Sequence, residues 1–323
     1  MRSLEGRMVE AVQIRGYTTK NESILELARQ DGTGRPIEEV VQGLARAKLA
    51  EAEKLLQAID EDWAPPPYDP FLVAQALGIR CVPVEKEGLE DAMIFVQDGT
   101  PTILFRPERT RVRTRFNIFH EIAHTLFPDY QRNSLYRRAR RPRLFEPEGQ
   151  LEYLCDVAAA EFLMPMHLFR CDLEQRGFGA AQVAFLCRRY GASMEAVCLR
   201  MMESNMRSCA LAFFEYKGPL KKRRRKDLDL LPDVQVAPQR SVRVSYTVPS
   251  QGFKEGGFFV PSHLPLGSRS CIHRASRSKK AAQGEELLDL GRGRTERFLV
   301  EALPMSARRR HGRTPVLAFF YPI

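Results

Sequence analysis

Apolar residues recur at helical spacing in two stretches near the middle of the chain. The first is residues 116–127, where apolar side chains lie three or four positions apart and cover neighbouring faces of one helix. They are Phe116, Phe119, Ile122, Ala123, Leu126 and Phe127. The second stretch, residues 149–165, is also strongly helical. The pattern predicts two helices, the first of them mostly buried, around which the other elements are placed.

The first 64 residues predict an N-terminal helical extension. Asn21 can cap a short helix that ends near Arg29, and Pro36 can open a long helix whose apolar residues keep helical spacing as far as Ile59. The three prolines at 65–67 cannot continue that helix. We therefore place a domain boundary after residue 64 and expect the long helix to pack on the next domain.

Residues 65–166 predict a compact domain with a small sheet. Asp69 can cap a short helix, and a β-rich run over residues 79–84 follows it. Ala92–Val96 and Thr102–Phe105, joined through Asp98-Gly99, predict a hairpin. The sheet and the two helices together form this domain.

The remaining chain predicts a helical segment followed by a β-rich domain. Within residues 167–208, two short helices over 182–190 and 193–202 have the spacing of a helix-turn-helix, although such pairs are also ordinary packing elements. From residue 209 to residue 323 we predict strands over 209–216, 241–248, 257–260, 297–303 and 315–321. The fold class expected for the whole chain is α+β.

The charge of the chain is concentrated in its last third. Residues 1–209 hold 28 Lys and Arg against 30 Asp and Glu, a balance of −2, whereas residues 210–323 hold 22 against 10, a balance of +12. This excess indicates an acidic partner, nucleic acid included, for the C-terminal part. There is no apolar run of the ~20 residues that a membrane helix needs, and residues 1–17 lack the apolar centre of a secretory signal. We expect a cytoplasmic protein without a membrane partner.

The first buried helix carries His120, Glu121 and His124 in the spacing H-E-x-x-H. Residues four apart stack on one face of a helix, so both imidazoles can bind one Zn²⁺, while Glu121 lies beside them and can activate water. The alternative is a pair of core histidines on an amphipathic helix. The seven cysteines are widely spaced and contain no C-x-x-C pair, which argues against a disulfide framework and against a Cys₄ zinc site.

A catalytic zinc site needs a third protein ligand. Glu152 and Asp156 lie four apart on the second helix, so we assign Glu152 to the metal and Asp156 to the outer N–H of a ligating histidine. His167 is the rival third ligand. An oxyanion donor is also needed, and Tyr130, Tyr136 or His167 can supply it, a choice that the sequence leaves open.

These residues carry a family resemblance. HEIAH, followed by E-x-x-x-D/N-x-x-A-A-x-x-L-M-P over Glu152–Pro165 and preceded by PYDPFLVAQALGIRCVPV, resembles the ImmA/IrrE family of zinc metallopeptidases. The resemblance covers Pro67–Ser204. The chain departs from the family at Asp156, where Asn is common, and at Cys155, where small residues are common. If Cys155 faced the metal, the site would be more thiolate-like.

The resemblance implies a gluzincin-like minimal fold with His120, His124 and Glu152 as zinc ligands and Glu121 as general base. It implies an endopeptidase that cleaves a helix-turn-helix repressor and so induces a stress or mobile-element response. Mn²⁺ is an alternative activating metal. The resemblance also implies a GAF-like, sensor-like domain after the peptidase.

Two hypotheses of different classes follow. The leading one is a zinc endopeptidase, with Thr102–Phe105 as an edge strand that holds extended substrate beside the motif helix. The alternative is a DNA-binding transcriptional regulator with a non-catalytic zinc site, although no fourth ligand for a closed site is evident. We expect DNA to bind the basic C-terminal third only non-specifically, because no base-reading helix is visible there.

Overall fold

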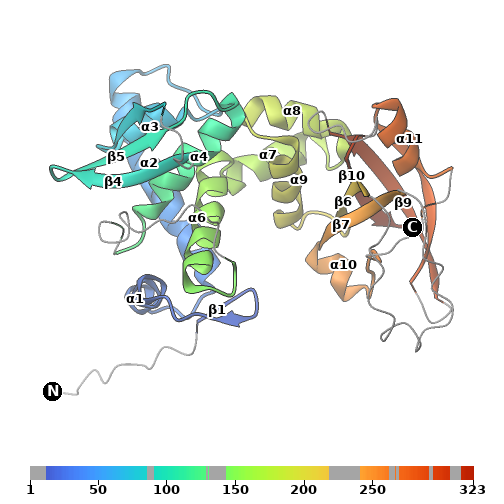
Figure 1. The fold of residues 1–323 in the computed structure, drawn as a ribbon. Helices are drawn as coiled ribbons and strands as arrows, with labels where there is room; N and C mark the ends of the chain where they lie inside the picture. Colours follow the sequence, from blue (N-terminus) through green and yellow to red (C-terminus); the bar gives the residue numbers. More distant parts are fainter. Residues whose placement is uncertain are drawn as a thin grey trace. The chain divides into compact units, whose positions relative to one another are not determined.

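The computed structural model describes residues 12–85, 91–128, 130, 143–217, 241–261, 266, 269–290, 294–305 and 314–323 (Figure 1). Helices and strands are both abundant, which confirms the α+β class. The chain forms two compact units. The first consists of Met1–Phe169 and Leu186–Ser193, and the second of Arg170–Phe185 and Met194–Ile323. The predicted division of these units into smaller domains stays a prediction.

The helices of the first unit begin and end largely where capping residues predict. They are α1 (Glu22–Asp31), α2 (Ile37–Ile59), α3 (Pro70–Ala76), α4 (Arg111–His124) and α6 (Pro147–Leu163), preceded by a small hairpin of β1 (Gln13–Ile14) and β2 (Tyr17–Thr18). The Asn21 side chain accepts the Ile24 N–H and opens α1, and the Asp69 side chain accepts the Phe71 N–H and opens α3. Pro36 stands at the N-cap of α2, one position before the place expected for it.

The long helix α2 packs against α6, as the sequence predicts for the N-terminal extension. Its buried face is apolar, with Val40, Val41, Ala45, Leu49 and Ala52 among its members. One polar contact joins the two helices, because Arg46 Nη1 lies 3.3 Å from Glu161 Oε1. The extension is therefore part of the support of α6.

A three-stranded sheet lies in the first unit, with strand order β3-β5-β4. Its strands are β3 (Arg80–Pro83), β4 (Ala92–Gln97) and β5 (Thr100–Phe105). The hairpin turns at Asp98 and Gly99, which both have positive φ, as an Asp-Gly two-residue turn requires. The prediction that Thr102–Phe105 is an edge strand is wrong, because β5 pairs with β3 on one side and β4 on the other. Among the described strands, β4 is the edge that packs on α4.

The interface of α4 and α6 forms the core of the first unit. Phe119 of α4 stacks on Phe162 of α6 with ring centroids 5.7 Å apart. Ile122 of α4 and Ala158 of α6 are fully buried, as the helical spacing of the apolar residues predicts. This packing fixes one helix against the other and sets the positions of their polar side chains.

The second unit is built on a five-stranded antiparallel sheet with the order β7-β6-β10-β9-β8. Its elements are α9 (Met194–Glu203), β6 (Ala210–Lys217), β7 (Ser241–Pro249), α10 (Gln251–Glu255), α11 (Cys271–Ser278), β8 (Ala282–Asp289), β9 (Thr295–Pro304) and β10 (Val316–Pro322). Two further helices, α7 (Met166–Arg176) and α8 (Ala180–Tyr190), each contribute to both units. An apolar cluster packs α10 and α11 on this sheet.

Two details of the second unit differ from the sequence prediction. The predicted strand over residues 257–260 is wrong, since this segment follows α10 without strand pairing, and Phe258 and Val260 pack on the apolar cluster. Strand β8 is not predicted from the sequence, because it is an edge strand that accepts charged residues, and Glu285 and Glu286 obscure its strand pattern. Among the described helices, none is long and apolar enough to span a bilayer.

Candidate metal centre

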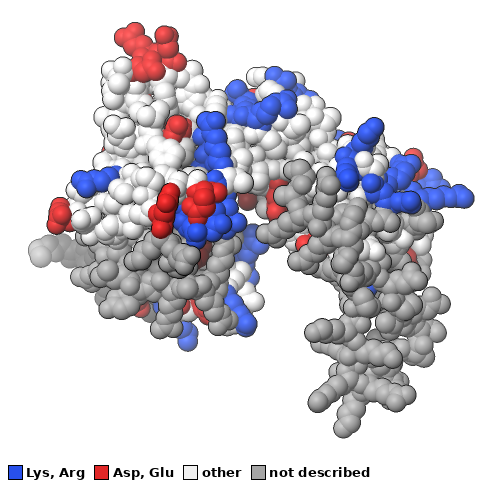
Figure 2. All heavy atoms as spheres, turned by 45° about the horizontal axis from the view of Figure 1, so that its top comes forward, with Lys and Arg blue, Asp and Glu red and all other residues white. Residues whose placement is uncertain are grey.

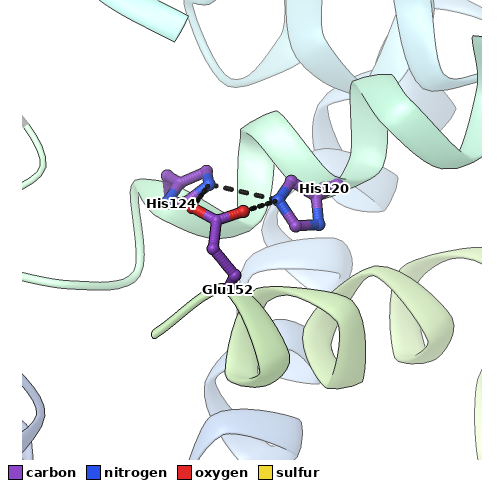
Figure 3. Close-up of side chains that lie close together, drawn as sticks. All are labelled: His120, His124 and Glu152. Carbon is purple, nitrogen blue, oxygen red and sulfur yellow. Dashed lines mark hydrogen bonds and ion pairs between the residues drawn. The ribbon is translucent and has the colours of Figure 1, made fainter. Parts of the chain in front are cut away.

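Helix α4 directs two histidines toward a common point. The Nε2 atoms of His120 and His124 are 3.3 Å apart, and their ring planes meet at 73° (Figure 3). The spacing of four residues produces this arrangement, because it places both side chains on one face of the helix. His124 is only 2% exposed, so the helix interface holds its ring in place.

Helix α6 brings Glu152 to the same point (Figure 3). Its Oε2 lies 3.0 Å from His120 Nε2, and its Oε1 lies 3.6 Å from His124 Nε2. Zinc bonds of about 2.1 Å at tetrahedral angles would place ligand atoms roughly 3.4 Å apart. The observed separations of 3.0, 3.3 and 3.6 Å lie near this value, although the two distances to the histidines start from different oxygens of Glu152. The donor set of two imidazoles and a carboxylate is one that zinc takes.

The outer nitrogens of both histidines face α6. Asp156 Oδ1 lies 2.9 Å from His120 Nδ1, the contact expected from the i, i+4 spacing of Asp156 and Glu152. Cys155 Sγ lies 3.2 Å from His124 Nδ1, on the side of the ring away from Nε2. The sequence analysis did not assign this contact. The sulfur does not complete the group formed by His120, His124 and Glu152.

Acidic neighbours control the charge of His120. Burial alone would lower its pKa, but hydrogen bonds with Asp156 and Glu152 outweigh burial and raise the pKa to about 10. Without a metal, His120 therefore carries a proton at neutral pH. A metal ion would displace this proton, because imidazole binds a metal in its neutral form.

Glu121 is held by the neighbouring sheet. Its carboxylate is 4% exposed, and Oε2 accepts the backbone N–H of Ile94 at 2.8 Å. Ile94 belongs to β4, so an edge-strand N–H orients the side chain predicted to act as base. Sequence reasoning missed this contact because a backbone donor leaves no signal in the residue pattern.

The remaining candidate residues do not join the converging group. His167 is exposed on α7, and the described metal-ligand group consists of His120, His124 and Glu152 without it. Tyr130 is partly buried six residues after the end of α4, and Tyr136 lies outside the described residues. The oxyanion role of these side chains stays a prediction.

A family model described as "IrrE N-terminal-like domain", Peptidase_M78, matches residues 74–202. The match supports an ImmA/IrrE family member. The match contains α4, α6 and every residue of the converging group, and it supports a peptidase.

A solved structure of a Mycobacterium tuberculosis transcriptional regulator is similar to this chain, with 13% sequence identity and a TM-score of 0.46. The match covers 87% of this chain and 88% of that chain. No curated protein matches the chain significantly.

Proposed function

We propose that the ImmA/IrrE chain is a zinc-dependent endopeptidase whose metal is held by His120, His124 and Glu152. The observation that carries the proposal is the convergence of these three side chains at separations of 3.0 to 3.6 Å. Two histidines and one carboxylate leave one position open for water or substrate, as catalytic zinc sites do. Mn²⁺, which accepts the same donors, is an alternative activating metal.

When bound, the metal ion supplies a Lewis acid that polarises the scissile carbonyl and activates water. Glu121 takes the proton of the attacking water and passes it to the leaving amine. The Ile94 N–H keeps one carboxylate oxygen of Glu121 in place, at 2.8 Å. Asp156 accepts the Nδ1–H of His120, which directs the Nε2 lone pair of that ring to the metal.

The edge strand β4 is the proposed position for extended substrate, in place of β5. The Ile94 N–H reaches Glu121 rather than a neighbouring strand, so this edge of β4 lies directly beside the proposed base. A peptide added along β4 would bring its backbone close to Glu121 and gain main-chain hydrogen bonds. Strand addition requires an unfolded or extended segment in the target protein.

We further propose that the target is a helix-turn-helix repressor in the cytoplasm, whose cleavage induces a stress or mobile-element response. The family match supports the peptidase on which this proposal depends, and the target is the one that the family resemblance implies. The second unit has a five-stranded antiparallel sheet, with α10 and α11 in the connection from β7 to β8, and this architecture supports a sensor-like role of the GAF kind.

DNA binding by the second unit is proposed to be non-specific. Arg274, Arg277, Lys279 and Lys280 are exposed in and after α11, and Figure 2 shows basic side chains over this part of the surface. In α9, by contrast, Arg200 is 1% exposed, and Glu195 accepts the hydroxyl of Tyr246. These side chains are engaged inside the unit, which does not favour α9 as a base-reading helix.

The test is cleavage of purified candidate repressors by the full chain, with Zn²⁺, with Mn²⁺ and with a chelator. We expect cleavage that the chelator stops. Glu121→Gln should lower the rate by about 10²- to 10⁴-fold with zinc content near wild type, because Glu121 moves a proton and is not a ligand. Glu148→Gln, which removes the same charge from an exposed site on α6, is the matched control. Loss of zinc in Glu121→Gln would contradict the assigned role.

A further inference from the structure

One turn of α6 contacts the metal group three times. Glu152 lies at its centre, Asp156 reaches the outer nitrogen of His120, and Cys155 reaches the outer nitrogen of His124. Positions i, i+3 and i+4 lie on one face of a helix, so a single turn can present all three groups to α4. The contact made by Cys155 is the one that neither the family match nor the proposed ligand set explains.

The direction of the Cys155 contact follows from the role of the opposite nitrogen. If His124 Nε2 binds a metal in the neutral ring, the proton must sit on Nδ1. The Nδ1–H then points at Cys155 Sγ, 3.2 Å away, and the sulfur accepts it. Cys155 is fully buried and His124 is 2% exposed, so water has little access to replace this partner.

We propose that Cys155 is a positioning residue, whose neutral thiol accepts the His124 Nδ1–H and holds that ring in its metal-binding tautomer and orientation. The inference rests on the proposed metal centre. It also makes the two histidines unequal. His120 has a carboxylate behind it, whereas His124 has a weak, neutral sulfur acceptor.

The competing explanation is that Cys155 only fills space between α4 and α6, since a free cysteine behaves as a small buried apolar residue. The two explanations separate when volume and acceptor are changed independently. Cys155→Val fills the space without an acceptor, whereas Cys155→Ser retains an acceptor in a slightly smaller side chain. Cys198→Val is the matched control, because Cys198 is also fully buried but lies in the second unit.

The experiment measures zinc affinity of the full chain by competition with a chromophoric chelator, together with the ¹⁵N shifts of the histidine rings. We expect Cys155→Val to weaken zinc binding about 10-fold, at the lower end of the 10- to 100-fold range for outer partners of metal ligands. The zinc affinity of Cys155→Ser should stay within about 3-fold of wild type. Asp156→Ala should weaken zinc binding more than Cys155→Val does, because it removes a charged acceptor. In Cys155→Val, the His124 Nδ1 signal should lose its hydrogen-bonded shift.

Circular dichroism of the metal-free variants shows whether each has folded. If Cys155→Val does not fold, the comparison of Cys155→Ser with wild type still tests the proposal. Wild-type affinity and an unchanged His124 signal in Cys155→Val would overturn the positioning role while leaving the proposed metal centre intact. Equal weakening by Cys155→Ser and Cys155→Val would also overturn it, because the acceptor would then make no difference. Failure of the wild-type chain to bind zinc at all would overturn the proposed function as well.

Discussion

The α4–α6 interface and the five-stranded sheet are both well buried, but they bury different kinds of side chain. The two helices of this interface bury Glu121, His124 and Glu161, with exposures of 4%, 2% and 0%. The sheet and its helices α10 and α11 enclose an apolar cluster in which aromatic rings such as Phe298 are central. Burying a charged or polar group costs free energy unless it is paired, so the interface is the part of the molecule arranged for chemistry.

These three buried polar groups have specific partners. Glu161 accepts from Arg46 and from the Met166 N–H, Glu121 accepts from Ile94, and His124 contacts Cys155. Such pairing offsets the cost of burial and fixes each side chain in one orientation. The apolar cluster needs no such pairing, because the burial of apolar surface area stabilises it. The two regions should therefore respond differently to substitution.

The largest effect is expected from Glu152→Ala, which removes a proposed ligand. Zinc binding should weaken by roughly 1,000-fold or more, since even partners of ligands are worth about 10- to 100-fold. The global fold should persist, because Glu152 is only partly buried. Metal content after dialysis and chelator competition measure the loss. Glu148→Ala and His167→Ala, both at exposed positions outside the metal group, are the controls, and an equal loss from His167→Ala would reopen the identity of the third ligand.

The second effect concerns stability instead of metal binding. Phe298 is fully buried, and its ring contacts those of Phe253, Phe258 and Phe320. Phe298→Ala should lower the free energy of unfolding of the second unit by about 3–5 kcal/mol, through lost burial and the cavity that remains. Leu287→Ala, at a position 66% exposed on β8, should change it by less than about 0.5 kcal/mol. Denaturant unfolding measures both, and a shift in zinc affinity by Phe298→Ala would contradict the separation of the two regions.

Local patterns explain how much of the site could be predicted. The positions of His120, His124 and Glu152 follow from spacing within two helices, and helical periodicity is a local pattern that the sequence of each helix shows. The pairing of Asp156 with His120 follows from the same rule. The Ile94 contact does not, because it joins a strand to a helix through a backbone N–H that every residue type offers.

Long-range pairing explains what was missed in the fold. The central place of β5 depends on its parallel pairing with β3, which residue patterns inside β5 do not encode. Strand β8 was missed because an edge strand accepts charges such as Glu285 and Glu286, which hide its alternation. Phe258 and Val260 look like part of a strand but serve the apolar cluster, so hydrophobicity predicted their burial and not their backbone pairing.

A third prediction addresses a polar contact of the second unit. Glu301 of β9 accepts the Ala180 N–H at 2.8 Å and the Tyr321 hydroxyl at 3.0 Å. Burial, with the nearby Glu301 charge, raises the pKa of Tyr321, so this hydroxyl stays a donor across the neutral range. Glu301→Ala should lower the free energy of unfolding by about 1–3 kcal/mol, because it leaves two partly buried donors without this acceptor. Thermal unfolding measures the loss, and Glu296→Ala, near the start of the same strand, is the control.

The smallest effect is expected from ion pairs of the first unit that are partly exposed to solvent. Asp91, directly before β4, lies 2.6 Å from Arg109 and also pairs with Arg113 in the first turn of α4. Partial burial alone would raise the pKa of Asp91, but the two arginines outweigh it and hold the pKa below its usual value. A carboxyl group with a lowered pKa stabilises the fold above its unfolded pKa of about 3.9 and loses that contribution as the pH falls through its folded pKa.

Asp91→Asn should accordingly lower the free energy of unfolding by about 1 kcal/mol at pH 7, because solvent screens a pair in which both arginines are partly exposed. The difference from wild type should shrink as the pH is lowered below about 4. Urea unfolding of both proteins between pH 7 and pH 3 measures this change. Glu108→Gln, in an exposed pair with Arg106, should give a smaller difference at every pH. A constant difference for Asp91→Asn over the whole range would show that the side chain acts through its hydrogen bonds and not through its charge.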